Sequence, residues 1–323
     1  MIVVDKRPEI SVVMPVYNAE CYVRQAIESI LNQTNSNFEL IIIDDCGTDS
    51  SMDIAQEMKD ERIRIVHNTE NRGIAYSRNR GLELAKGKYI ALMDDDDIAP
   101  SNRFELETHF LEEHKDIDVV GGGELWIDEN GKVISYADQI ICNPKRIQAE
   151  LIFWDVIENG SAMMRTEFIR KNNLKYEDGY LGMEDYKFWT ECSVVGNIAN
   201  IDRVLLYWRK TYESETFRAG REQAQERRKK FAEIQKNALH LNGFDFSEKE
   251  EKLFTECFAE NKREYIGKSK LEQLCSLLKK MMMQAEKNKQ KNVEELKFVC
   301  RRMYALKTEN SELWEDMNNV SKF

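Results

Sequence analysis

The first hundred residues alternate between short apolar runs and segments with helical periodicity. The runs are rich in β-branched residues, which favours strands, and the intervening segments carry apolar residues three or four positions apart, as helices do. The expected strands are residues 10–16, 38–44, 63–67 and 88–94. The expected helices are residues 19–33, 50–58 and 74–86. Alternation at this pitch predicts an α/β fold with a mainly parallel central sheet flanked by helices.

Polar clusters follow three of these strands. Residues 15–18 (PVYN) follow the first, residues 44–49 (DDCGTD) the second and residues 94–97 (DDDD) the fourth. The carboxyl ends of parallel strands lie at one edge of the sheet, and ligands bind at this edge in such folds. We therefore expect the three clusters to face one cleft, although the same residue types also form turns and helix caps.

The four consecutive aspartates need a partner for their charge, because neighbouring carboxylates repel each other. Mg²⁺ and Mn²⁺ prefer oxygen ligands, and they commonly combine one or two carboxylates with substrate phosphates. The sequence contains no P-loop or dinucleotide fingerprint, so a bound phosphate would be held by the metal and by basic side chains. Candidates are Arg72, Arg78 and Arg80, of which at least one is expected on a solvated helix face.

The rest of the chain changes character twice. Residues 116–218 are irregular and predict α+β structure, whereas residues 219–323 contain no proline and little glycine. An apolar stripe at helical spacing is formed by Leu271, Leu274, Cys275, Leu278, Met282 and Ala285. We therefore expect a C-terminal helical region. It could act in homo-oligomerisation through this stripe or in peripheral membrane contact through nearby lysines. The simpler interpretation is a solvated charged face.

Charge and composition limit the class of protein. The formal net charge of −11 disfavours a nucleic-acid-binding protein. The apolar runs are too short to span a membrane, and no secretory signal is expected at the start. Seven cysteines without a CxxC pair fit free thiols in a reducing compartment. These features predict a cytoplasmic location, with peripheral contact at the inner face of the cell membrane as a further expectation.

Several ordered motifs resemble the inverting glycosyltransferases of family 2. The motifs are PVYN, LIIIDDCGTDSS, NRGIAYSRNRGLELAKGKYIALMDDDD and GMEDYKFW, within residues 10–214. The resemblance implies a GT-A fold, a nucleotide-sugar donor and a divalent cation, Mn²⁺ or Mg²⁺. It also implies a catalytic domain at residues 1–218, with a nucleotide-binding half at about 10–115 and an acceptor half at 116–218, followed by the helical region at 219–323.

The resemblance further implies roles for individual residues. Those expected to bind the nucleotide are Pro15, Val16, Tyr17, Asp45, Arg72, Arg78, Asp94 and Asp95. Among them Asp45 would meet the uracil edge and Asp95 the ribose, while Asp96 would coordinate the metal ion. Asp185 would be the catalytic base. Those expected near the donor sugar or the acceptor are Ser161, Glu184 and Trp189.

Two positions depart from the family pattern. Cys46 stands where relatives have glycine, so the turn is expected to differ. Thr211 stands where relatives have a histidine, which would weaken metal binding or change its geometry. Asp185 also has a simpler interpretation, as an acidic residue in the first turn of a helix. The tryptophans that could stack on a sugar, rather than pack in the core as most do, are Trp126, Trp154 and Trp189.

The expected function is transfer of a sugar, N-acetylglucosamine or galactose, from a UDP-sugar to a hydroxyl of a glycan or lipid-linked acceptor in bacterial surface polysaccharide synthesis. The implied mechanism is one inverting displacement, in which the cation and an arginine stabilise the leaving diphosphate and Asp185 deprotonates the acceptor. Two alternatives stay open. They are a catalytically silent binding or scaffold protein on the same fold, and a metal-dependent nucleotidyltransferase that releases pyrophosphate.

Overall fold

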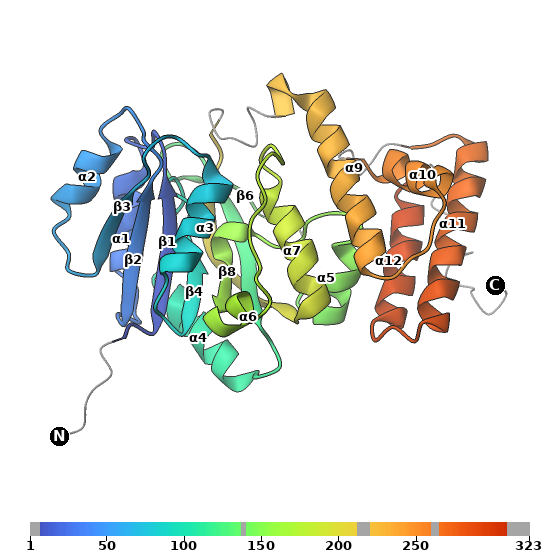
Figure 1. Cartoon of the computed structure of the whole chain (residues 1–323), viewed down its shortest axis with the longest axis horizontal. Coiled ribbons are helices and arrows are strands. Elements are labelled where there is room, and N and C mark those ends of the chain that lie inside the picture. The colour runs from blue at the N-terminus through green and yellow to red at the C-terminus, as the bar shows by residue number, and fades with distance from the viewer. Residues whose placement is uncertain (1–6, 137–139, 212–219, 260–264, 309–323) are drawn as a thin grey trace.

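The computed structural model describes residues 7–136, 140–211, 220–259 and 265–308 (Figure 1). Its strands are β1 (Ile10–Val16), β2 (Phe38–Asp44), β3 (Ile63–His67), β4 (Tyr89–Leu92), β5 (Val119–Ile127), β6 (Val133–Tyr136), β7 (Met163–Arg165) and β8 (Ile198–Arg209). Its helices are α1 (Val23–Leu31), α2 (Ser51–Glu57), α3 (Ile74–Leu84), α4 (Arg103–Glu113), α5 (Pro144–Glu150), α6 (Thr166–Lys171), α7 (Glu184–Val195), α9 (Ala224–Leu241), α10 (Glu248–Phe258), α11 (Lys268–Lys287) and α12 (Val293–Ala305), with a 3₁₀ turn η1 at Asn159–Ser161.

One sheet runs through the first two hundred residues in the order β3-β2-β1-β4-β7-β5-β6, with β8 paired to β5. The strands β1 to β4 are parallel neighbours. By contrast, β7 is antiparallel to both β4 and β5. The predicted α/β fold with a central sheet is therefore confirmed, and all four expected strands are present. The fourth strand spans Tyr89–Leu92 rather than residues 88–94, although Met93 still donates its backbone N–H to the carbonyl of Val13 at 3.1 Å.

Helices cover both faces of the parallel half of the sheet because the strands are apolar on both sides. Alternate side chains of a strand point to opposite faces, so Val13 packs under α3 while Val12 packs under α1. The approach of α3 to β1 requires glycine at position 81, since a Cβ there would lie 2.2 Å from Cγ1 of Val13. This packing fixes the carboxyl ends of β1, β2 and β4 side by side.

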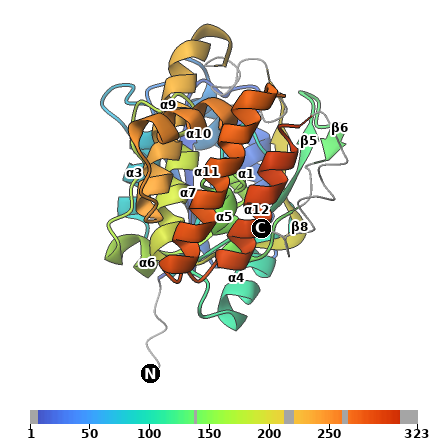
Figure 2. The same ribbon diagram turned by 90° about the vertical axis from the view of Figure 1, so that its right-hand side faces the viewer.

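The C-terminal helices α9 to α12 form a bundle beside α5 and α7 (Figure 2). Phe153, which follows α5, packs against Phe254 and Phe258 of α10, with ring centroids 5.1 and 5.0 Å apart. The hydrophobic core is therefore continuous between the segments around α5 and α7 and the C-terminal helices.

The apolar stripe of α11 is placed inside this bundle. Leu274, Leu278 and Ala285 are buried within the chain, whereas Leu271, Cys275 and Met282 are partly exposed. The stripe is helical as predicted, and homo-oligomerisation through the C-terminal helices stays a prediction. Its spacing identified an apolar face without showing that α12 covers it. None of the helices in the described ranges is long and apolar enough to cross a membrane.

Candidate active site

A cleft of about 720 Å³ opens at the carboxyl ends of β1, β2 and β4. All three polar clusters expected there contribute to its wall, with Pro15, Val16, Tyr17, Asn18, Asp45, Asp94, Asp95, Asp96 and Asp97. The opposite wall comes from later segments, with Glu124, Trp126, Asp155, Glu158, Asn159, Glu184, Asp185, Tyr186, Trp208, Thr211, Arg227 and Phe231. The cleft therefore lies between the parallel strands and the second half of the chain.

The aspartate run is fixed by two neighbouring segments. Asp95 accepts a hydrogen bond from the backbone N–H of Tyr17, at 2.9 Å, which ties the run to the end of β1. Asp97 accepts one from the backbone N–H of Arg209, at 2.8 Å. These contacts leave the Asp96 side chain between them, facing the cleft.

Burial and mutual repulsion raise the pKa of these carboxyls. Burial is the larger cause for Asp95 and Asp97, with the charge of Asp96 next. Burial and the charge of Asp94 raise the pKa of Asp96 to about 7. A cation at this position would favour the ionised form of Asp96.

The donor chemistry of the run fits a hard divalent cation. No group of three or more histidine, cysteine, aspartate or glutamate side chains is arranged to hold a metal within the described residues. Mg²⁺ rarely uses such an all-protein cage, because it takes one or two carboxylates and completes its coordination with water and substrate phosphates. Asp96 supplies one carboxylate of this kind, so the residues present fit a cation that is completed by a diphosphate.

Asp45, at the end of β2, is bound by the segment that leads into α3. One of its carboxylate oxygens accepts hydrogen bonds from the Asn68 amide, at 2.6 Å, and from the backbone N–H of Arg72, at 2.9 Å. The other oxygen accepts from the backbone N–H of Gly73, at 2.8 Å. Cys46 beside it has a left-handed backbone, with φ of 60°. The turn therefore has a conformation that suits glycine, which cysteine adopts here at some cost.

Arg78 links the two walls of the cleft. Its guanidinium donates to Asp94 at 2.8 Å and to Glu184 at 2.7 Å, and its side chain is only 4 % exposed. If Arg78 contacts a diphosphate as expected, its guanidinium must do so while it also pairs with these two carboxylates. The pairing of a donor-side aspartate with the residue before Asp185 sets the distance between the walls.

Asp185 lies in the first turn of α7, on the wall opposite the aspartate run. Burial raises its pKa well above the usual range, and the charges of Asp155 and Glu184 add to the effect, while Arg78 opposes it. A carboxylate with a raised pKa is a stronger base than an exposed one. The position and the electrostatics of Asp185 therefore suit proton transfer.

Arg209 at the end of β8 is an organising residue that the sequence motifs did not identify. It is fully buried, and its side chain donates to the backbone carbonyls of Asp96 at 2.7 Å and of Asp128 at 3.1 Å. It also donates to the Gln25 side chain at 2.8 Å. Arg209 thus fixes the backbone of the aspartate run. The surrounding YWRKTYES was the available signal, but nothing in it distinguishes a buried arginine from an exposed one.

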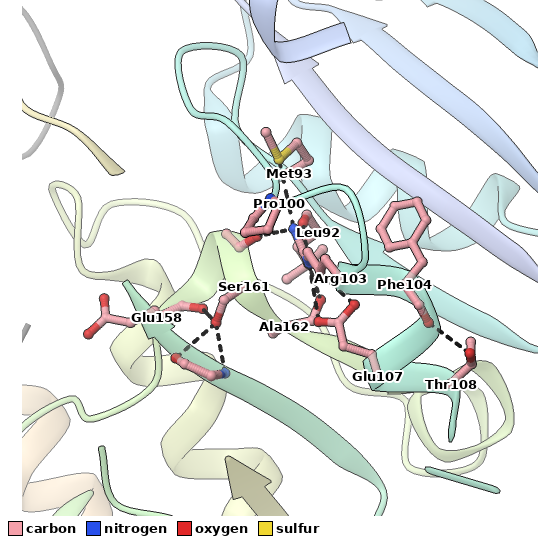
Figure 3. Close-up of polar contacts among 12 residues, drawn as sticks. Leu92, Met93, Pro100, Arg103, Phe104, Glu107, Thr108, Glu158, Ser161 and Ala162 are labelled. Atoms are coloured by element: carbon pink, nitrogen blue, oxygen red, sulfur yellow. Dashed lines mark hydrogen bonds and ion pairs between the residues drawn. The ribbon is translucent and has the colours of Figure 1, made fainter. Parts of the chain in front are cut away.

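Arg103 of α4 connects the end of β4 to the segment before β7 (Figure 3). Its side chain is fully buried and donates to the carbonyl of Leu92 at 3.0 Å and to that of Gly160 at 2.6 Å. Glu107, one turn later in α4, faces it at 3.2 Å. Burial raises the pKa of Glu107 to about 7 against the opposing charge of Arg103.

Two further acids line the second wall. The Trp126 indole donates to Glu124, and the ring of Trp126 lies 5.2 Å from that of Trp208. Burial raises the pKa of Glu158, and Glu124, which accepts its hydrogen bond, raises it further. This wall therefore offers an aromatic surface beside two hydrogen-bonded carboxyls.

Three of the residues expected at the site do not line the cleft. Trp189 is fully buried and packs against Phe188 at 4.8 Å, so it cannot stack on a sugar here. Ser161 is also fully buried, and its hydroxyl donates to the carbonyl of Glu158 at 2.8 Å. The side chain of Arg72 lies over the ring of Tyr76 at 4.4 Å, outside the cleft. Spacing alone could not separate these residues from the lining ones.

The comparison with family models gives one match, to glycosyl transferase family 2, over residues 11–172. That segment covers half of the 323 residues and includes β1 to β4, with all three polar clusters. The chain belongs to glycosyl transferase family 2. The resemblance noted in the sequence is therefore confirmed.

Two relatives in this family extend the comparison. A glycosyltransferase of Haemophilus influenzae described as uncharacterized is 36% identical over 211 residues, which are 62% of this chain and 65% of the relative. The putative teichuronic acid biosynthesis glycosyltransferase TuaG of Bacillus subtilis is 41% identical over 109 residues, which are 33% of this chain and 43% of TuaG. The chain thus spans less than two thirds of either relative.

The family-2 chain also shares its fold with a solved structure. TarS of S. aureus, residues 1–349, in complex with UDP-GlcNAc gives a TM-score of 0.62 at 16% sequence identity. The match covers 97% of this chain and 91% of that one, so it includes the C-terminal helices. At this identity the similarity concerns the GT-A fold and not the substrates.

Proposed function

We propose that this protein is a metal-dependent inverting glycosyltransferase, which moves a sugar from a UDP-sugar to a hydroxyl of a glycan or lipid-linked acceptor. N-acetylglucosamine is favoured because the structurally similar TarS binds UDP-GlcNAc, with galactose as the other candidate from the sequence. A role in bacterial surface polysaccharide synthesis is favoured by the similarity to TuaG. Residues 10–115 would form the nucleotide-binding half and residues 116–218 the acceptor half.

The observation that carries the proposal is that two carboxylates from distant segments, Asp96 and Asp185, line one cleft. Asp96 lies on the wall that ends the parallel strands, and Asp185 lies on the wall formed by α7. Displacement at an anomeric carbon with inversion needs a leaving group on one face of the sugar and a base on the other. The cleft offers these two positions.

On the donor side, Asp45 would accept a hydrogen bond from the base of the nucleotide, with Pro15, Val16 and Tyr17 packed beside it. Asp95 would contact the ribose. Asp96 would hold Mg²⁺ or Mn²⁺, and a bound cation would supply Lewis-acid stabilisation of the charge on the leaving diphosphate. Arg78 would keep Asp94 in place and add positive charge near the diphosphate.

On the opposite side, Asp185 would remove the proton of the acceptor hydroxyl as that oxygen attacks. The C1–O bond to the diphosphate breaks as the new C1–O bond forms, and the proton ends on Asp185. Glu184 would hold Asp185 in position through Arg78, and Trp126 would offer a face to a sugar ring. A base of raised pKa performs this step well near neutral pH.

The first test pairs two conservative variants of the cleft, Asp96→Asn and Asp185→Asn. Thermal unfolding is measured with UDP, GDP, dTDP or CDP, each with Mn²⁺, Mg²⁺ or EDTA. A ligand at about a hundred times its dissociation constant stabilises the fold by roughly 2.7 kcal/mol. We expect UDP with a cation to raise Tm in the wild type and in Asp185→Asn, but not in Asp96→Asn.

Turnover of a UDP-sugar completes the test. We expect Asp185→Asn to lower it by about 10² to 10⁴. An absence of any nucleotide-induced shift would contradict the donor site and favour a scaffold protein. Unchanged turnover in Asp185→Asn would contradict the assignment of the base. Pyrophosphate release from a nucleoside triphosphate would favour a nucleotidyltransferase instead.

A further inference from the structure

Helix α9 of the C-terminal region reaches the catalytic cleft. It lies beside α7 (Figure 1), and two of its side chains, Arg227 and Phe231, line the cleft. The Phe231 ring lies 5.3 Å from the ring of Tyr186, which directly follows Asp185. A helix outside the segment matched by the family model therefore forms part of the wall that holds the proposed base.

Arg227 contacts the turn that leads into α7. Its guanidinium donates to the backbone carbonyl of Leu181 at 2.7 Å and to that of Gly182 at 3.4 Å. One helical turn later, the ammonium group of Lys230 lies 5.3 Å from the centroid of the Tyr180 ring. Residues at positions i, i+3 and i+4 share one face of a helix, so Arg227, Lys230 and Phe231 act as one contact surface against the turn.

The turn itself has an unusual backbone. Gly179, Leu181 and Gly182 all have positive φ, of 86°, 54° and 72°. A leucine in the left-handed region is unfavourable and persists only where its surroundings hold it. The carbonyls at residues 181 and 182 are the groups that Arg227 binds, so this arginine holds the turn where its own geometry is least favourable.

The far side of the same turn is held by Arg78. Glu184 begins α7 and pairs with Arg78 at 2.7 Å. The segment between residues 181 and 184 is therefore fixed at one end by α9 and at the other by the donor half. Asp185 follows directly. Its carboxylate accepts a hydrogen bond from the backbone N–H of Tyr186 at 2.7 Å and has no salt bridge within the described residues. Its position then depends on the two arginines.

We propose that Arg227 is a positioning residue for Asp185, and that α9 makes the C-terminal helical region necessary for catalysis. Arg227 acts through the backbone of the turn rather than on the sugar or the nucleotide. This inference rests on the proposed role of Asp185 as the base. It predicts that changes at Arg227 lower the rate of the chemical step and leave nucleotide binding intact.

The test uses the full chain and three variants at neighbouring positions of α9. Arg227→Met removes the donors but keeps a long side chain, Arg227→Lys keeps one charged donor, and Arg228→Met is the control at an exposed position one residue along. UDP release from UDP-GlcNAc with water as the acceptor gives kcat and KM. We expect Arg227→Met to lower kcat by roughly 10²-fold, as a misplaced catalytic group does, with KM unchanged and partial recovery in Arg227→Lys.

A double mutant separates this inference from the proposed function. If Arg227 acts through Asp185, then Arg227→Met will cause no further loss of kcat in an Asp185→Asn background. A multiplied loss would contradict the inference, as would full activity of Arg227→Met. Full activity of Asp185→Asn would instead overturn the assignment of the base.

Hydrogen exchange gives a readout that does not depend on the donor or the acceptor. Peptides that cover residues 180–190 are followed in the wild type and in each variant. We expect about tenfold faster exchange at the start of α7 in Arg227→Met, with wild-type rates in Arg228→Met and throughout β1. Wild-type exchange rates in Arg227→Met would contradict the inference.

Discussion

The two walls of the cleft are built in different ways. On the donor wall, each polar cluster follows its strand directly, and β1, β2 and β4 are parallel neighbours in the sheet. On the other wall, the position of Asp185 depends on contacts between distant parts of the chain. Arg78 and Glu184 are separated by 106 residues, and Arg227 and Leu181 by 46.

This difference concerns how each wall is stabilised. The donor wall inherits its shape from the hydrogen-bonded ladder and the apolar cores on both faces of the sheet. The start of α7 on the other wall is held by two arginines, because Arg78 pairs with Glu184 and Arg227 binds the backbone carbonyl of Leu181. Breaking a buried pair from one side is costly because it leaves an uncompensated charge. Single substitutions should therefore affect the second wall more than the first.

Arg78→Met should have the largest effect, because it removes the link between the walls. Asp94 and Glu184 would both lose their cation, and we expect a loss of about 3–5 kcal/mol in the free energy of unfolding. Nucleotide-induced stabilisation and turnover should fall together. Urea unfolding measures the first effect and the thermal-shift assay the second.

Arg72→Met is the matched control for that variant. Arg72 lies just before the same helix, but its side chain is 48% exposed and its ion pair with Glu70 measures 3.7 Å. An exposed pair of this kind contributes at most about 1 kcal/mol. Equal losses of unfolding free energy in Arg78→Met and Arg72→Met would contradict the view that the buried ion pairs stabilise the fold more than the exposed one.

Arg103→Met should have the next largest effect on stability, because it removes the side chain that links β4 to the segment before β7. The carbonyls of Leu92 and Gly160 lose a donor, and Glu107 loses its partner, so we expect a loss of about 3 kcal/mol. The double variant Arg103→Met/Glu107→Leu should recover part of this loss, since no uncompensated charge remains. Urea unfolding of both at pH 8 provides the measurement. A double variant less stable than Arg103→Met would show that the carbonyl contacts dominate.

The sequence predicted the donor wall far better than the other wall for a physical reason. Apolar strands, and the turns that follow them, are local patterns, and parallel pairing then brings their ends together. Arg103 and Arg209 are fully buried, yet an arginine in a sequence reads as a surface residue. Trp189 and Ser161 were misplaced for the same reason, because burial depends on which helices cover a segment. The apolar stripe of α11 was visible, but its cover by α12 was not.

A smaller effect is expected on the pH dependence of turnover. Asp185 must be ionised to act as a base, so kcat rises as the pH increases through its pKa. After burial, the charge of Asp155 is the next largest cause that raises this pKa. Asp155→Asn should therefore move the acidic limb of the kcat profile to lower pH, by about one unit. A shift to higher pH, or none, would show that Asp155 does not act on the base.

The smallest effect is expected at the donor turn, where Cys46 has a φ of 60°. Cys46→Gly relieves an unfavourable backbone but loses the thiol contact to the carbonyl of Asn68, at 3.1 Å, and it loosens the unfolded chain. These effects oppose each other, so we expect less than about 1 kcal/mol of change and unaltered UDP binding.

Gly73→Ala provides the opposite exchange on the same turn. Gly73 has a φ of 83° and a ψ of 167°, a region essentially restricted to glycine, and open space where a Cβ would lie. Alanine therefore adds backbone strain without a clash, at a cost of about 1–3 kcal/mol. Both positions lie beside Asp45: Cys46 follows it in the chain, and Gly73 donates its backbone N–H to its carboxylate. Cys46→Gly could instead destabilise the fold more than Gly73→Ala. That result would show that side-chain contacts, rather than backbone geometry, hold the segments around Asp45. Both walls would then depend on side-chain contacts, despite their different topology.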